Sequence, residues 1–219
     1  MGRVGFFVTL GFNESRALRA VADAKQCGGE VVLIIKRDPV EAGRKAVNNV
    51  TSFAKPLGVP VRIIEVNSQD WREVIRLARI MREYDDVRVI IGGGLRIPQA
   101  FTLLAALDVW GRVSHLEVHD HDTGEDITIP KWLVPLITSP ERRGKVRVLL
   151  ALSIDTPKTK AELARLTGLS EQTVSKYLSY LIKARLAKKV IPNKYKLTEL
   201  GQKLKEAYAE GALGGVDRE

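Results

Sequence analysis

The feature that most constrains the fold is a regular alternation of short apolar segments with longer amphipathic segments over the first 130 residues. The segment 31–35 is apolar throughout, which is typical of a strand buried on both faces of a parallel sheet. Strands are predicted over 4–10, 31–35, 61–66, 87–91, 113–119 and 127–129. Helices are predicted over 14–26, 40–57, 70–84 and from Pro98 to about residue 110. This alternation indicates βαβ units with right-handed crossovers, and therefore a Rossmann-like, mostly parallel sheet.

A different pattern occupies residues 159–189, where two helices flank a tight turn at Gly168. The second helix opens at Ser170, which can cap it, and carries one apolar stripe. That stripe consists of Val174, Tyr177, Leu178 and Leu181. Two short strands over 188–191 and 194–198 follow, joined by a turn at Pro192 and Asn193. The fold class is therefore α/β, a Rossmann-like sheet followed by a smaller winged helix-turn-helix domain.

The face opposite the apolar stripe carries small polar and cationic side chains that suit base edges and phosphates. The candidate DNA-binding residues are Ser170, Gln172, Thr173, Ser175, Lys176 and Lys194. We expect Gln172 and Thr173 to contact bases, and Ser175, Lys176 and Lys194 to contact phosphates. The expected partner is double-stranded DNA, in a palindromic promoter site. The alternative is an ordinary helical hairpin with a solvated basic face.

The net charge of +9 is concentrated in the last third of the 219 residues. Residues 140–219 hold 17 Lys and Arg against 9 Asp and Glu, whereas residues 1–139 hold 18 against 17. The basic excess therefore accompanies the helix-turn-helix, as expected for a nucleic-acid-binding module. The single cysteine, Cys27, excludes an internal disulfide and suits a reducing cytoplasm. Neither a signal peptide nor an apolar run of ~18 residues is found, so we expect a cytoplasmic protein without a membrane span.

These patterns predict two domains joined by a proline-rich segment. Residues 1–130 form the Rossmann-like domain, 131–140 a hinge, 141–210 the winged helix-turn-helix and 211–219 a flexible tail. The helix over 98–110 is apolar nearly all round, whereas packing on a sheet requires only one apolar face. Its surplus apolar surface indicates a homodimer formed through this helix, and burial under a neighbouring helix is the alternative.

Two loops of the predicted sheet have the composition of a ligand site. In the common strand order 3-2-1-4, the loops after the first and fourth strands flank one crevice at the carboxyl ends of the strands. Glycines allow a close approach, Arg96 adds a positive charge, and Phe12 offers a face for stacking. The candidate ligand-binding residues are Thr9, Gly11, Phe12, Asn13, Glu14, Ser15, Gly92, Gly93, Gly94, Leu95 and Arg96. The alternative is that the glycines only form tight turns.

Two common nucleotide-binding signatures are missing. The fingerprint G-x-G-x-x-G belongs after the first strand, where only Gly11 stands, and no Walker A sequence is present. The sequence therefore disfavours a dinucleotide cofactor, and we expect no cofactor.

The loops 9–14 and 92–96, together with the C-terminal winged helix, resemble the CRISPR-associated transcription regulators. These proteins join a CRISPR-associated Rossmann-fold (CARF) sensor domain to a winged helix-turn-helix. The resemblance implies a homodimer that binds cyclic oligoadenylate, with the four-adenylate ring favoured, across its two-fold axis. It also implies transcriptional control of CRISPR-associated genes in antiviral defence. Gly11, Phe12 and Asn13 would line one wall, and residues 93–96 the other.

An enzyme is the alternative function. Related sensors are fused to ribonucleases with an Arg and a nearby His, and Arg112 and His119 have a similar spacing but flank a predicted strand. The run 119–122, His-Asp-His-Asp, could hold a metal, although a solvated strand end explains it as well. We assign no catalytic and no metal-binding residue. The alternative that remains is a nucleotide-acting, ring nuclease-like enzyme with an accessory winged-helix module.

Overall fold

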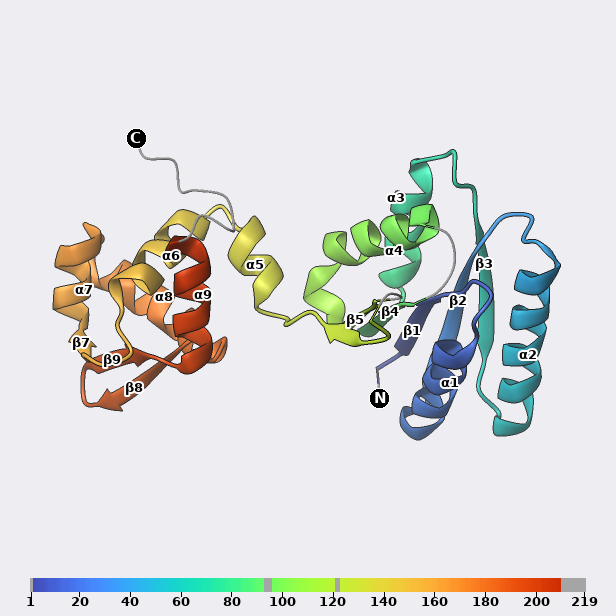
Figure 1. Cartoon of the computed structure of the whole chain (residues 1–219), viewed down its shortest axis with the longest axis horizontal. Helices are drawn as coiled ribbons and strands as arrows, with labels where there is room; N and C mark the ends of the chain where they lie inside the picture. Colours follow the sequence, from blue (N-terminus) through green and yellow to red (C-terminus); the bar gives the residue numbers. More distant parts are fainter. Residues whose placement is uncertain (1, 93–95, 121–122, 210–219) are drawn as a thin grey trace. The chain divides into compact units, whose positions relative to one another are not determined.

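The computed structural model describes residues 2–92, 96–120 and 123–209, which fall into two compact units, 1–134 and 135–219 (Figure 1). Each unit is described by itself. The site residues Gly93, Gly94 and Leu95, His121 and Asp122 of the run 119–122, and the tail 211–219 lie outside the described residues.

The first unit is built on a six-stranded sheet whose order is β3-β2-β1-β4-β5-β6. Its strands are β1 (Val4–Thr9), β2 (Glu30–Lys36), β3 (Val61–Val66), β4 (Asp86–Ile91), β5 (Val113–His119) and β6 (Asp126–Thr128). All neighbouring pairs are parallel except β5 and β6, which are antiparallel. The mostly parallel Rossmann-like sheet is thus confirmed, and so is the adjacency of β1 and β4.

Helices cover both faces of this sheet. They are α1 (Ser15–Cys27), α2 (Glu41–Leu57), α3 (Arg72–Met81) and α4 (Arg96–Asp108), with the 3-10 turn η1 (Trp110–Arg112) before β5. Successive residues of β1 enter opposite cores: Phe6 and Val8 pack with α1 and α2, whereas Phe7 packs with α3 and α4. Figure 1 shows these two helix pairs on opposite sides of the sheet.

The ends of the helices differ in places from the predictions. Gly28 and Gly58 adopt left-handed conformations at the ends of α1 and α2, as glycine permits. Helix α3 starts at Arg72, two residues after the start predicted at residue 70, and the Asp70 carboxylate accepts a hydrogen bond from the Arg72 N–H. Helix α4 ends at Asp108, so Trp110, expected on its apolar surface, lies in η1 and is buried in the core.

Tyr84 is a buried residue of this unit's core whose hydroxyl forms a hydrogen bond. Its side chain is fully buried, its ring meets the edge of Phe7 at a centroid distance of 5.3 Å, and its hydroxyl donates to Glu30 Oε2 at 2.8 Å. Burial, reinforced by the carboxylate of Glu30, raises the pKa of Tyr84 to about 12. The folded protein therefore favours the neutral, protonated form of the Tyr84 side chain.

The chain after β6 is attached to the first unit by specific contacts. The Ile129 N–H donates to Leu116 O, the Trp110 indole Nε1 donates to Lys131 O at 3.0 Å, and Val134 is buried in the core. The segment expected as a hinge, 131–140, contains the short helix α5 (Leu133–Thr138).

The second unit is a helical domain with a three-stranded antiparallel sheet of order β7-β9-β8. Its elements are α6 (Arg142–Ala151), β7 (Lys158–Thr159), α7 (Lys160–Thr167), α8 (Glu171–Lys183), β8 (Ala187–Ile191), β9 (Lys194–Leu197) and α9 (Glu199–Ala209). Thr159 and Glu162 form a capping box at α7, which ends at left-handed Gly168. The helix-turn-helix and its wing, β8 and β9, are where the sequence predicted them.

Helix α9 approaches the backbone of this unit closely at Gly201. A Cβ at this position would lie 1.9 Å from Leu186 O, a distance that no side chain tolerates. Gly201 is therefore required where α9 crosses the segment between α8 and β8.

Candidate functional site

The two loops of the candidate crevice meet at Thr9 and Gly92. Thr9 ends β1 and is paired in register with Ile91, the last residue of β4. The Gly92 N–H donates to Thr9 Oγ1 at 3.2 Å, and both residues are buried. The carboxyl ends of β1 and β4 are thus joined directly, at the point where the order of the strands reverses.

The first wall of the crevice is the loop between β1 and α1. Phe12 is 66% exposed, so its ring is available for stacking. Asn13 Oδ1 accepts the N–H of Ser15 at 2.9 Å and so shapes the loop itself. Glu14 accepts a hydrogen bond from Asn49 of α2, and this bond is the main cause of the lowered pKa of Glu14. Within this loop, Phe12 is therefore the best placed of these side chains to contact a ligand.

The second wall lies at the start of α4. Arg96 is the first residue of that helix and is exposed. The structure thus places Thr9 and Gly92 at the floor, Phe12 on an exposed loop and Arg96 at an exposed helix start.

Arg16, which the sequence analysis did not single out, lies against Gly92 at the junction of β1 and β4. A Cβ on Gly92 would lie 2.2 Å from Arg16 Cδ, so the arginine side chain fills the space that glycine leaves. Arg16 Nη2 lies 2.8 Å from Asp126 Oδ1, and the guanidinium also contacts His119 Nδ1. The Arg16 side chain is only 16% exposed. Gly92 therefore makes room for a partly buried cation.

Further charged side chains extend this cluster along β5. Arg19 of α1 bonds both Glu117 and Asp126. The pKa of Asp126 is lowered, chiefly by its hydrogen bond from Arg16. Among the described residues, no group of three His, Cys, Asp or Glu side chains has the arrangement of a metal site.

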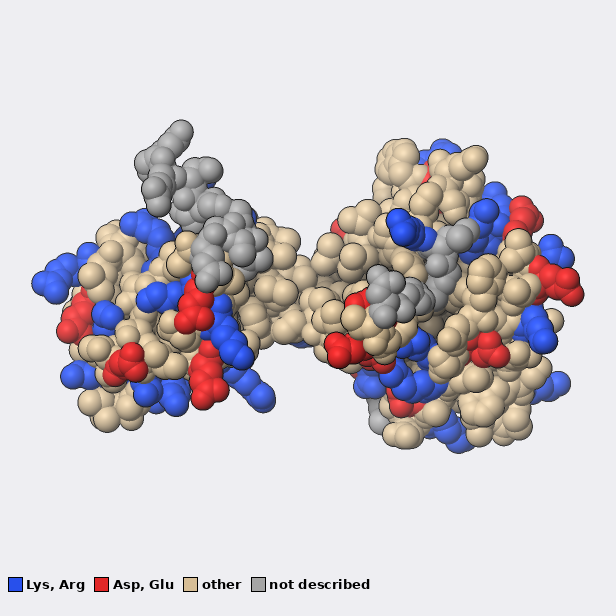
Figure 2. All heavy atoms as spheres, viewed as in Figure 1, with Lys and Arg blue, Asp and Glu red and all other residues tan. Residues whose placement is uncertain are grey.

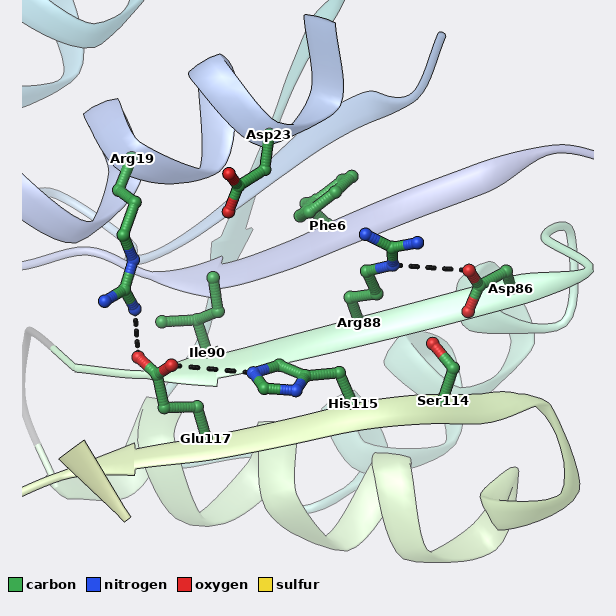
Figure 3. Close-up of a pocket in the computed structure, with 9 residues that line it drawn as sticks. All are labelled: Phe6, Arg19, Asp23, Asp86, Arg88, Ile90, Ser114, His115 and Glu117. Carbon is green, nitrogen blue, oxygen red and sulfur yellow. Dashed lines mark hydrogen bonds and ion pairs between the residues drawn. The ribbon is translucent and has the colours of Figure 1, made fainter. Parts of the chain in front are cut away.

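A hollow of about 480 Å³ adjoins this cluster on the same face of the sheet (Figure 3). Its side chains come from α1, β1, β4 and β5, and several of the charged ones are paired with one another. Arg88 bonds Asp86 and stacks over Phe6 at 5.0 Å, while Glu117 accepts from Arg19 and lies 3.5 Å from His115 Nε2. The charges lining this hollow are already largely neutralised within the protein.

Arg112 and His119, whose spacing resembles that of the ribonuclease signature, make contacts with different parts of the first unit. Arg112, in η1, donates to Tyr84 O at 3.0 Å, whereas His119, at the far end of β5, belongs to the Arg16 cluster. The Arg112 and His119 side chains therefore bind different partners and do not contact each other in these interactions.

In the second unit, helix α8 presents the expected polar face. Val174, Tyr177, Leu178 and Leu181 are buried, which leaves Gln172 and Lys176 exposed. Ser170 Oγ accepts the Thr173 N–H at 3.2 Å and bonds the Thr173 hydroxyl, so the predicted N-cap is confirmed. Ser170 thus has a structural role at the helix start.

The cations of this surface differ in their partners. Lys176 forms an ion pair with Glu141, the residue that precedes α6, whereas Lys194 is exposed at the start of β9. Figure 2 shows Lys and Arg side chains spread over one face of this unit, with fewer acidic ones among them.

The outer face of α4 is apolar and exposed. Ile97 and Leu104 are 45% and 50% exposed, and Ala100 between them is also exposed. The residues expected on this helix that pack inward are Phe101, Leu103 and Leu107, which are partly buried against the core.

A Rossmann-like domain followed by a winged helix-turn-helix defines a regulator-type architecture, and comparison with known proteins agrees. The chain belongs to the family described as the Csa3 CRISPR-associated Rossmann-like domain, which matches residues 4–130. Residues 142–189 match the helix-turn-helix of the family described as bacterial regulatory protein, arsR family. The protein therefore joins a CRISPR-associated Rossmann-like domain to a regulatory helix-turn-helix, as the resemblance in sequence implied.

Among solved structures, the chain is similar to the crystal structure of protein VC1899 from Vibrio cholerae, with 11% identity and a TM-score of 0.38. The similarity covers 96% of this chain and 66% of that one. A search of curated proteins finds no match. None of the described helices is both long and apolar enough to cross a membrane.

Proposed function

We propose that this protein is a transcription regulator of CRISPR-associated genes whose Rossmann-like unit binds a cyclic oligoadenylate, the four-adenylate ring being the first candidate. The observation that carries the proposal is the junction of β1 and β4 at Thr9 and Gly92, with exposed Phe12 and Arg96 on the two loops that leave it. A stacking ring and a guanidinium beside one crevice suit the bases and phosphates of an oligonucleotide.

Titration calorimetry on the full chain tests this proposal. Cyclic tetra-adenylate and cyclic hexa-adenylate are titrated into the wild type, Phe12→Ala and Arg96→Ala. Loss of stacking at Phe12 should cost ~1–3 kcal/mol of binding free energy, and loss of the phosphate contact at Arg96 ~1.5–3 kcal/mol. Arg62→Ala, which removes a surface ion pair with Glu83 elsewhere in the same sheet, is the matched control. Absence of binding heat with both rings in the wild type would refute the sensor function.

DNA binding is assigned to the second unit, through α8 and the wing. Gln172→Ala should cost ~1–3 kcal/mol and relax specificity at one base position. Lys194→Ala should weaken all sequences alike and flatten the dependence of affinity on salt. We propose a palindromic promoter site read by a homodimer, because the exposed apolar face of α4 would be covered by the same helix of a second copy.

A nucleotide-cleaving activity is the second candidate, and the observation that favours it is the contact of His119 with Arg16 beside Gly92. A histidine and a cation near a phosphodiester are groups that general acid–base cleavage uses. Incubation with cyclic tetra-adenylate and chromatography of the products tests it. Linear products that disappear in His119→Ala would support the enzyme, and an intact ring would exclude it.

A further inference from the structure

Strand β6 is held in the fold by charge more than by apolar packing. All three of its residues are exposed, Ile127 by 52%, and it pairs with β5 over three positions only. Its first residue, Asp126, accepts hydrogen bonds from Arg16 and Arg19 of α1. A short edge strand with so little buried area has low local stability, so these two arginines contribute much of what holds it.

The Arg16 side chain passes beside Gly92 on its way to Asp126. Its Cδ occupies the space next to Gly92, and its guanidinium extends from there to β6. We therefore expect an anion bound at the junction of β1 and β4 to meet this guanidinium. Because Arg16 Nε and Nη2 both bond Asp126 Oδ1, a phosphate oxygen that took them would displace this carboxylate.

The segment after β6 would transmit such a change. Residues 129–134 follow β6 at once and are fixed by the Ile129 bond to Leu116 O, the Trp110 bond to Lys131 O and the burial of Val134. This segment is the only covalent connection to the DNA-binding unit. A shift of β6 therefore changes the restraint on the start of that connection.

We propose that the Arg16–Asp126 pair is a latch, opened when a phosphate of the bound ligand exchanges with Asp126 on the Arg16 guanidinium. This inference rests on the proposed function, and it adds both a further ligand-binding residue and a route of regulation. Arg19 remains paired with Glu117 and with Asp126 Oδ2 when the latch opens, so α1 stays attached to β5 and β6 is loosened while still being held.

Hydrogen exchange and calorimetry on the full chain test the latch, with the wild type, Arg16→Gln, Asp126→Asn and the control Arg62→Gln. Without ligand, exchange of the amides of residues 126–129 should rise about tenfold in Arg16→Gln and Asp126→Asn, and not in the control. Cyclic tetra-adenylate should produce a similar rise in the wild type. Asp126→Asn should bind the ring several times more tightly than the wild type, since the competing carboxylate is gone, and Arg16→Gln less tightly.

The opposite direction of the two affinity changes separates a latch from a merely structural pair. Weaker ring binding in both variants, or ring binding that leaves β6 protected in the wild type, would overturn the latch while the sensor function stands. Absence of ring binding overturns the sensor function. Unchanged amide exchange in both variants without ligand would show that the Arg16–Asp126 pair does not hold β6. That result would overturn the latch whether or not the ring binds.

Discussion

Lys176 on α8 and Glu141 before α6 form an ion pair, with Nζ and Oε1 2.5 Å apart. The lysine that we expect to contact phosphate is thus already paired inside the DNA-binding unit, and this pairing lowers the pKa of Glu141. We therefore propose that DNA competes with Glu141 for Lys176 and that the ion pair lowers DNA affinity.

Glu141→Gln should increase DNA affinity, about threefold to tenfold at low salt, and should steepen the salt dependence by about one phosphate contact. The change frees Lys176 and removes a negative charge from the binding surface. Fluorescence anisotropy over a range of salt concentrations measures both effects. Glu206→Gln on α9 alters the net charge equally and serves as the control. An equal increase in DNA affinity in that variant would show that the effect comes from net charge alone.

Ser170→Ala should lower the free energy of unfolding of the second unit by about 1 kcal/mol, because it removes the cap of α8. Ser179→Ala, in the exposed part of the same helix, should change it by less than about 0.5 kcal/mol. Thermal denaturation followed by circular dichroism compares the two. If Ser170→Ala is as stable as the wild type but loses DNA binding, its hydroxyl contacts DNA and the cap is dispensable.

Leu104→Glu should convert the proposed homodimer to a monomer at micromolar concentration, because it places a charge at the centre of the exposed face of α4. Sedimentation velocity gives the mass of each species. Val40→Glu, which alters an apolar side chain 63% exposed before α2, should leave the dimer intact. If the wild-type protein sediments as a monomer, the proposed homodimer interface through α4 is wrong.

The first unit should lose stability between pH 10 and pH 12 in a way that depends on Tyr84. The pKa of Tyr84 is raised to about 12 in the folded protein, against about 10 in an unfolded chain. Its contribution is therefore complete below pH 10 and is lost as the pH rises through 12, on the order of 1–3 kcal/mol.

Urea unfolding followed by tryptophan fluorescence measures this loss, because Trp71, Trp110 and Trp132 all lie in the first unit. Tyr84→Phe is the control, since it removes the titrating hydroxyl and leaves every other titratable group in place. The difference in stability between the two proteins should narrow from pH 9.5 to pH 12. A constant difference would show that Tyr84 does not titrate differently on folding.

Local patterns predicted the elements that depend on neighbouring residues. The parallel strands, the cap at Ser170 and the turn at Gly168 follow from short stretches of sequence, and the structure has all three. The predicted start of α3 was two residues too early, because the Asp70 carboxylate accepts a hydrogen bond from the Arg72 N–H while Asp70 itself lies before the helix. The residue type alone does not show how far before a helix such an aspartate lies.

The candidate site was only partly predictable for the same reason. Glycine at position 92 indicated a close approach, but the group that approaches is Arg16, whose partner Asp126 is 110 residues away in the chain. Nothing in the neighbourhood of Arg16 indicates that the β5–β6 hairpin folds back beside α1. A pairing of this kind requires the tertiary structure.

The close contact of Gly201 with Leu186 O also limits how this domain can evolve. Helix α9 and the start of the wing touch through main chain, so neither can move to accept a side chain without moving the other. Random mutagenesis should therefore recover glycine alone at position 201, however freely the surrounding residues drift. Changes in promoter preference would then have to arise on α8 or at the tip of the wing, leaving the base of the wing as the conserved part of the domain.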